Sequence, residues 1–166
     1  MKGPKEVLKS TQADEVLERE THTLLPSDLA TKARKVIRSE EIRVIPIVES
    51  RKLKGVLSAK DLLRITSTSS NVKVSGIMET PSIVGAPDWN LKELSEKAIE
   101  FDNYDIPLIQ GVEDKTFLGM VRIEKVLEKL AGCCGDEHKV GEIMTEEVFA
   151  SSTDTVLYMY YGNPSY

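Results

Sequence analysis

The sequence is poor in the residues that most catalytic and metal sites require. Its 166 residues include two histidines and two cysteines, and aromatic residues make up 5% of the chain. We find no Ser-His-Asp set, no HExxH motif and no P-loop, so we predict neither an enzyme nor a catalytic residue. The adjacent cysteines lie in the segment CCGDEH at residues 133–138. A few thiols and acids in a linker are weak evidence for a metal site, and we predict none.

Excess positive charge and long apolar runs are also absent from the sequence. The net charge is −5 and the pI is about 5.2, which argues against nucleic acid as the main partner because phosphate binding requires a basic surface. No apolar run approaches the roughly 18 residues of a membrane span, and the first residues lack the apolar region of a secretion signal. The composition is globular, with 40% apolar and 30% charged residues. We therefore expect a cytoplasmic protein that does not bind membranes.

The chain contains an internal repeat. Residues 23–48 align without a gap on residues 84–109, which lie 61 positions further along the chain. Residues 55–63 then align on residues 119–127, now at an offset of 64. The three additional residues fall in a charged turn, where insertions are tolerated. Two copies of one structural unit are the simplest explanation of this pattern.

A third copy begins near the C-terminus but is incomplete. Residues 139–157 resemble residues 73–91, and the following tail matches neither complete copy. Either the chain is a fragment of a longer protein or this segment packs on a neighbour. The predicted organisation is an N-terminal segment with the first repeat at 1–71, the second repeat at 72–131, and a linker, third start and atypical tail at 132–166.

Each complete copy has the pattern of a β-α-β-β-α unit. In the first copy, a short extended segment at 21–24 precedes a helix with Leu29, Ala33, Val36 and Ile37 on one face. Two strands at 44–48 and 54–57 follow, and a second helix at 59–65 closes the unit. A unit of about 55 residues buries little apolar area, so two should pack together around a shared core. The predicted fold class is α/β, of the α+β type.

Several short motifs, in the same order, resemble a known family. The run from Pro26 to Ala33, the tetrapeptide Ile45-Pro46-Ile47-Val48 and the stretch GVLSAKD ending at Asp61 resemble a cystathionine β-synthase (CBS) domain. The segment Gly76-Ile77-Met78 resembles the linker between two such domains. The resemblance extends over residues 16–130 and implies tandem CBS repeats, packed through their sheets as a pseudo-two-fold pair called a Bateman module.

This resemblance implies a sensor and not an enzyme. CBS pairs bind adenosine-containing ligands such as AMP, ADP, ATP or S-adenosylmethionine between the two copies, with no cofactor required. They also resemble dimerisation platforms, so we expect a homodimer and a regulated protein whose identity the sequence does not reveal. The alternative is a ligand-free dimerisation or protein-interaction module, or a fragment of a longer four-CBS protein.

The predicted ligand site follows the family pattern. Asp61 would accept the ribose hydroxyls, and Ser58 would receive phosphate at a helix start. A purely structural explanation competes, in which Ser58 and Asp61 form a capping box. Tyr104 stacks on a purine in one interpretation and is a half-buried sheet residue in the other. The predicted ligand-binding residues are Val56, Ser58, Asp61, Val84, Ala86, Asn103, Tyr104, Asp105, Pro107 and Arg122.

The second copy departs from the pattern. Arg122 and Lys125 stand where the first copy has Ser58 and Asp61, and neither can accept a hydrogen bond from ribose. We expect this second place to be empty or to bind something different, walled in part by Arg43. Arg122 would either meet a phosphate held by the first site or remain solvated. Asp105 near the ligand disfavours a polyphosphate, which favours adenosine with few phosphates or a cationic sulfonium.

Overall fold

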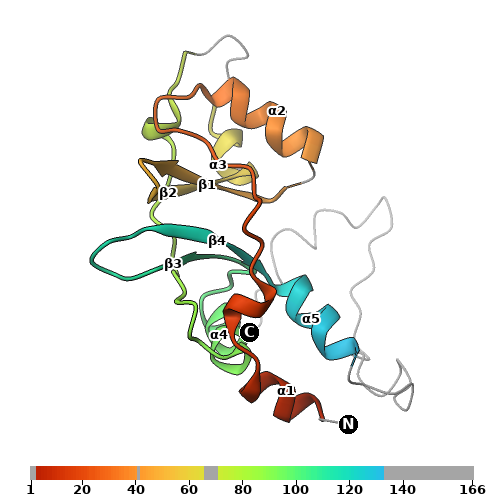
Figure 1. Cartoon of the computed structure of the whole chain (residues 1–166). Helices are drawn as coiled ribbons and strands as arrows, with labels where there is room; N and C mark the ends of the chain where they lie inside the picture. Colours follow the sequence, from red (N-terminus) through yellow and green to blue (C-terminus); the bar gives the residue numbers. More distant parts are fainter. Residues whose placement is uncertain (1–2, 41, 66–70, 133–166) are drawn as a thin grey trace, which may run out of the picture. The chain divides into compact units, whose positions relative to one another are not determined.

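The computed structural model describes residues 3–40, 42–65 and 71–132 of the chain. These residues form two similar halves, each built around one antiparallel hairpin (Figure 1). The hairpins consist of β1 (Val44–Glu49) with β2 (Lys52–Ser58) and of β3 (Asp105–Ile109) with β4 (Phe117–Arg122). The α-helices are α1 (Pro4–Ser10), α2 (Ala30–Glu40), α3 (Ala59–Leu63), α4 (Leu91–Glu100) and α5 (Ile123–Ala131). The CCGDEH segment, the third start and the tail lie outside the described residues.

The predicted order of helix, hairpin and helix is present in both halves. α4 buries Leu91, Leu94 and Ala98, which share one helical face and pack in the second core. α2 buries Ala33 in the same way in the first core. The prediction was wrong at Leu29, which lies before the first residue of α2 and is 40% exposed. Its backbone is extended there and forms a β-bridge with Lys73, so the helix begins one residue later.

The leading extended segments are shorter than predicted. In the described part of the chain, Leu24 makes a single parallel bridge to β1, and Gly85 makes the equivalent bridge to β3. The N–H of Leu24 donates to the Pro46 carbonyl (3.2 Å), and the N–H of Gly85 donates to the Pro107 carbonyl (2.9 Å). Each proline therefore faces a sparsely bonded edge, where a strand tolerates a residue without an N–H.

The two hairpins meet through a reciprocal pair of hydrogen bonds. The N–H of Leu53 donates to the Lys115 carbonyl (2.9 Å), and the N–H of Phe117 donates to the Arg51 carbonyl (2.8 Å). Leu53 matches Phe117 in the repeat, and Arg51 matches Lys115, so each bond is the symmetry equivalent of the other. A two-fold axis requires this reciprocity. The predicted pseudo-two-fold pairing of the repeats through their sheets is confirmed.

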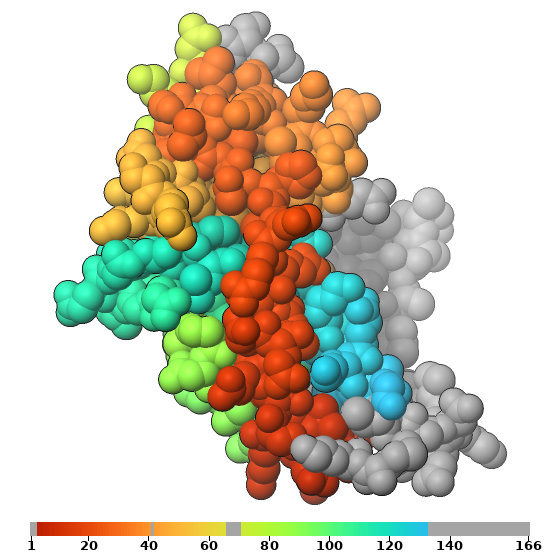
Figure 2. Space-filling model, in the orientation of Figure 1, coloured from red at the N-terminus to blue at the C-terminus, as the bar shows by residue number. Residues whose placement is uncertain are grey.

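The segment that leads into each repeat packs on the other repeat. Residues 11–18 lie against the second half, where Ala13 is fully buried among the residues of α4 (Figure 2, red). Residues 72–79 lie against the first half in the same way, and Val74 is fully buried in its core. Each hydrophobic core is therefore completed by a segment from outside its own repeat.

Helix α1 is an addition to the predicted elements. It contacts α4 and α5, and its Val7 is buried with 6% exposure. The helix starts after Gly3 with a proline in its first turn, which suits a position whose N–H has no helical partner. Across the ranges described above, none of the helices has the length and the apolar character needed to cross a membrane.

Candidate functional site

The junction between β2 and α3 is a complete capping box. The N–H of Ser58 donates to Asp61 Oδ2 (2.8 Å), and the Ser58 hydroxyl donates to the same oxygen (2.7 Å). The N–H of Asp61 donates in turn to Ser58 Oγ (3.4 Å). Asp61 is 3% exposed, and among the described residues only Asp105 is a carboxylate buried to a comparable degree. The local explanation of the Ser-x-x-Asp motif is therefore realised, and it holds the carboxylate in one orientation.

The equivalent junction of the second half has no side-chain cap. Arg122 occupies the N-cap position of α5, and its side chain makes no capping hydrogen bond. The helix nevertheless extends over nine residues. The fold therefore does not require a cap at this junction. Helix stability alone does not explain why the first half has a capping box, so Ser58 and Asp61 are candidates for a further function.

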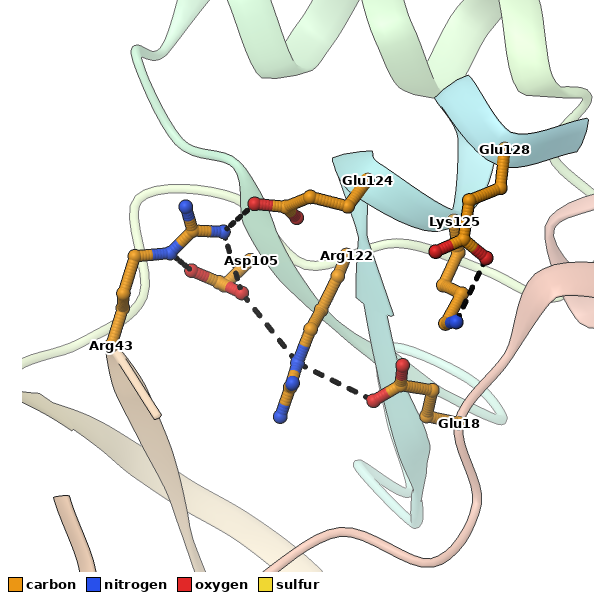
Figure 3. A pocket seen from close by; sticks show the side chains of 7 residues that line it. All are labelled: Glu18, Arg43, Asp105, Arg122, Glu124, Lys125 and Glu128. Atoms are coloured by element: carbon orange, nitrogen blue, oxygen red, sulfur yellow. Dashed lines mark hydrogen bonds and ion pairs between the residues drawn. The ribbon is translucent and has the colours of Figure 1, made fainter. Parts of the chain in front are cut away.

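A charged cavity of about 350 Å³ lies at this second junction (Figure 3). The guanidinium of Arg43 reaches into it from the first half, with Nε 3.0 Å from Asp105 Oδ2 and a terminal nitrogen 2.6 Å from Glu124 Oε1. Arg122 lies 3.3 Å from Glu18 and 3.9 Å from Asp105. The cavity is lined by four acids and three bases, namely Glu18, Asp105, Glu124, Glu128, Arg43, Arg122 and Lys125.

The ion pairs of this cavity shift the pKa values of their members. The hydrogen bond to Asp105 raises the pKa of the Arg43 guanidinium above its ordinary value, and Glu124 adds to the effect. Burial alone would raise the pKa of Glu124, but hydrogen bonds from its own N–H and from Arg43 bring the pKa below its ordinary value. The charged side chains around the second junction are thus paired with one another.

Asp105 joins this cavity to the predicted base-binding segment. Its carboxylate accepts from Arg43, and its N–H donates to Asn103 Oδ1 (3.2 Å). The Asn103 amide donates to Ser82 Oγ (3.1 Å). Tyr104, between them, is 44% exposed, and a hydrogen bond with Asp102 raises the pKa of its phenol. The structure therefore brings Asn103 and Asp105 together and leaves the Tyr104 ring partly accessible.

The remaining predicted residues lie along β2 and around a second cavity. Val56 pairs with Glu79 at the edge of β2, and Pro107 lies within β3. Val84 and Ala86 line a separate cavity of about 380 Å³, which includes neither Ser58 nor Asp61. Our sequence reasoning did not identify this cavity, because the residues that line it come from both repeats. The one feature of the sequence that could have indicated this cavity is its single tryptophan, Trp89, which lines it.

Sequence comparison identifies the first half directly. Residues 13–67 match the CBS domain family. The inosine-5′-monophosphate dehydrogenase of Staphylococcus epidermidis is 28% identical over 136 residues, which cover 80% of this chain and 27% of the dehydrogenase. The CBS domain-containing protein YhcV of Bacillus subtilis is 26% identical over 104 residues, which cover 61% of this chain and 72% of YhcV. The chain thus spans about a quarter of the length of the dehydrogenase it matches.

Solved structures share the fold of both halves. The CBS domain of a bacterial CNNM/CorC family Mg²⁺ transporter, in complex with ATP, superposes with a TM-score of 0.68 at 18% identity, covering 78% of this chain and 93% of that one. The CBS domain pair of protein MJ0100, in complex with 5′-methylthioadenosine and S-adenosyl-L-methionine, gives a TM-score of 0.62 at 19% identity, covering 74% and 97%.

These similarities and the reciprocal hairpin contact define the class of the protein as a tandem α/β repeat module. Residues 13–67 match the CBS domain family, and the described residues of the chain have the fold of a CBS domain pair. The resemblance inferred from the repeated motifs is confirmed.

Proposed function

We propose that this CBS pair is a regulatory module that binds an adenosine-containing small molecule between its repeats, with the ribose hydroxyls on Asp61. The candidates are AMP, ADP, ATP and S-adenosylmethionine. Two solved CBS structures of the same fold are complexes with ATP, or with 5′-methylthioadenosine and S-adenosyl-L-methionine. The observation that carries the proposal is the difference between the two junctions. A buried, oriented carboxylate stands at the first, whereas a cluster of ion pairs lines the cavity at the second.

The geometry of Asp61 suits this role. Ser58 fixes one carboxylate oxygen through two hydrogen bonds, so little side-chain entropy remains to be lost on binding. A carboxylate offers about four lone-pair sites, and two ribose hydroxyls need two of them. Each charge-assisted hydrogen bond contributes about 1.5–3 kcal/mol.

The charge of Asp105 no longer selects against polyphosphates. Its carboxylate is compensated by Arg43 at 3.0 Å and by Arg122 at 3.9 Å. The repulsion expected from an unpaired carboxylate is therefore weakened, and the choice among adenosine ligands depends on other contacts.

Calorimetric titration with AMP and with S-adenosylmethionine tests the proposal. We expect Asp61→Ala to weaken binding by about tenfold or more, since one lost charge-assisted bond corresponds to that change. Asn90→Ala is the matched control, because it removes the N-cap bond to the Glu93 N–H (2.9 Å) of α4 and leaves the proposed site intact. Binding that is unchanged in Asp61→Ala would contradict the assignment.

A second candidate function, an interaction module that pairs with another copy, is favoured by two exposed leucines. Leu63 on α3 is 81% exposed and Leu127 on α5 is 58% exposed, and the two positions match in the repeat. Large apolar side chains exposed at equivalent places suit a homodimer contact. Sedimentation of the Leu63→Lys/Leu127→Lys variant should show loss of a dimer. Val112→Lys changes an equally exposed residue (81%) in the hairpin turn and serves as control.

We further infer that the chain regulates another protein in the cytoplasm and has no catalytic activity of its own. The dehydrogenase relative is more than three times longer than the matched region, so its activity is not transferred to this chain. Activity of the purified chain towards inosine monophosphate and NAD would contradict this inference.

A further inference from the structure

The cavity that contains Val84 and Ala86 is mainly apolar and has room for a small molecule. Its volume is about 380 Å³, within the range of ordinary ligand pockets. Apolar side chains form most of its wall, among them Leu53, Ile109 and the half-buried Trp89. Val112 stands at its edge with 81% of its surface exposed. The cavity therefore combines a buried apolar wall with an open entrance.

The charge of this cavity is unusual for the chain. Acids outnumber bases by 27 to 22 in the whole sequence, yet among the described residues no acid lines the cavity, whereas Lys54 and Lys115 do. Asp114, the neighbour of Lys115, is engaged elsewhere, since it accepts from the Thr116 hydroxyl and pairs with Lys52 at 3.4 Å. The charged cavity at the second junction, by contrast, is lined by four acids. An apolar molecule with one negative group therefore matches the cavity that contains Val84 and Ala86. It does not match the charged cavity at the second junction.

The cavity is separate from the proposed adenosine site. Lys54 and Gly55 line it near the start of β2, whereas Ser58 ends the same strand. Four residues of strand separate Lys54 from Ser58 by about 13 Å. Ser58, Asp61, Asn103 and Asp105 do not line the cavity. Ligand binding in this cavity is therefore measurable separately from ligand binding at Asp61.

We propose that this cavity binds a small apolar carboxylate, with its hydrocarbon or aromatic part against Trp89 and Ile109 and its carboxylate between Lys54 and Lys115. The lysines come from different repeats, one on β2 and the other in the turn before β4. A bound carboxylate would contact both hairpins at the place where they already meet, since the Leu53 N–H donates a hydrogen bond to the Lys115 carbonyl. This ligand class differs from that of the proposed function and does not depend on it.

The fluorescence of Trp89, the only tryptophan in the chain, provides the test. The full chain is titrated with 4-phenylbutyrate and, in parallel, with the uncharged 4-phenylbutan-1-ol. We expect a saturable change of Trp89 emission, with dissociation constants in the millimolar range or below for a ligand of this size. The acid should bind about fivefold more tightly than the alcohol, as two partly exposed lysine contacts allow.

Two variants separate charge from shape. Lys54→Gln/Lys115→Gln should bind the acid as weakly as the alcohol, whereas Lys9→Gln/Lys35→Gln removes the same net charge from exposed positions on α1 and α2 and should leave binding unchanged. Ala86→Leu fills the cavity and should abolish binding of both molecules, with folding checked by circular dichroism.

Three results would overturn the proposal. They are no saturable emission change in the folded wild-type chain, equal affinity for acid and alcohol, or full binding in the folded Ala86→Leu variant. AMP titrated into the wild-type chain and into Lys54→Gln/Lys115→Gln, neither of which changes a residue predicted to bind adenosine, reports on Asp61 independently, so failure of one proposal is distinguishable from failure of the other.

Discussion

At the scale of single residues, two glycines permit the exchange of leading segments between the repeats. Gly119 has φ +151°, and a Cβ on it would lie 2.3 Å from the Glu18 carbonyl oxygen. Gly55, its match in the first repeat, would place a Cβ 2.9 Å from the Glu79 carbonyl oxygen. Both contacts are with backbone, which cannot move aside as a flexible side chain can. The glycine that begins each GVL or GMV motif is therefore required by a close backbone crossing.

We expect Gly119→Ala to destabilise the fold by about 1–3 kcal/mol, because it adds backbone strain and a steric clash. Gly55→Ala should cost less, since its contact is longer and its backbone is unstrained. Gly76→Ala is the control, because a Cβ there meets nothing within 4 Å. Urea unfolding followed by circular dichroism measures all three. Equal stability of Gly119→Ala and Gly76→Ala would show that the crossing is not constrained.

Arg43 is the other decisive residue, because it connects the halves electrostatically. It pairs with the 8% exposed carboxylate of Asp105 and with the 48% exposed carboxylate of Glu124. Arg43→Ala removes the hydrogen bond to the buried Asp105 carboxylate and leaves it only the longer contact with Arg122 at 3.9 Å, which costs about 1–3 kcal/mol. The Glu124 pair is exposed and contributes at most about 1 kcal/mol. Stability measurements on Arg43→Ala and Glu124→Gln should therefore give clearly different losses, and equal losses would contradict this assignment.

The Glu124 pair should also be sensitive to pH. Its pKa is lower in the folded chain than the ordinary value of 4.5, so the pair stabilises the fold above pH 4.5 and the contribution is lost as the pH falls below that value. A double-mutant cycle between Arg43→Ala and Glu124→Gln should show coupling at neutral pH and less coupling in acid. Coupling that stays constant while the pH is lowered until Glu124 is protonated would refute this prediction.

At the scale of elements, the sequence was sufficient to predict those features that depend on residues close together in the chain. The helical spacing of Leu91, Leu94 and Ala98 and the pair of short apolar runs joined by a charged turn in each copy were sufficient to predict helices and hairpins. The Ser58–Asp61 box was predictable for the same reason, since its partners are three residues apart. The contact between Arg43 and Asp105 was not predictable, because the two residues lie 62 positions apart in different repeats.

The sequence also did not predict that the segment leading into each repeat packs on the other repeat. Residues 72–79 have a buried Val74 but no regular periodicity, so the pattern did not indicate which core they complete. Helix α1 was missed for a related reason, because seven residues with one buried side chain give too weak a signal. Tertiary packing determines the position of both segments.

At the scale of the whole molecule, the exchange predicts which fragments fold. Residues 20–81 contain the first repeat with the segment that completes its core, whereas residues 1–71 lack Val74. We expect cooperative thermal unfolding of the fragment 20–81 and a broad, weak transition for the fragment 1–71. Circular dichroism and dispersion of amide signals in NMR spectra distinguish the two. A cooperative transition of the 1–71 fragment would show that the exchanged segment is dispensable.

The reciprocal hydrogen bonds between the hairpins have a consequence for the history of the chain. Two identical single units can make the same contact with each other, so the paired arrangement does not depend on the two copies having different sequences. Once one gene encodes both copies, nothing obliges them to change together. The difference between Asp61 and Lys125 at matched positions is what such release from symmetry permits, because one copy has an acid where the other has a base.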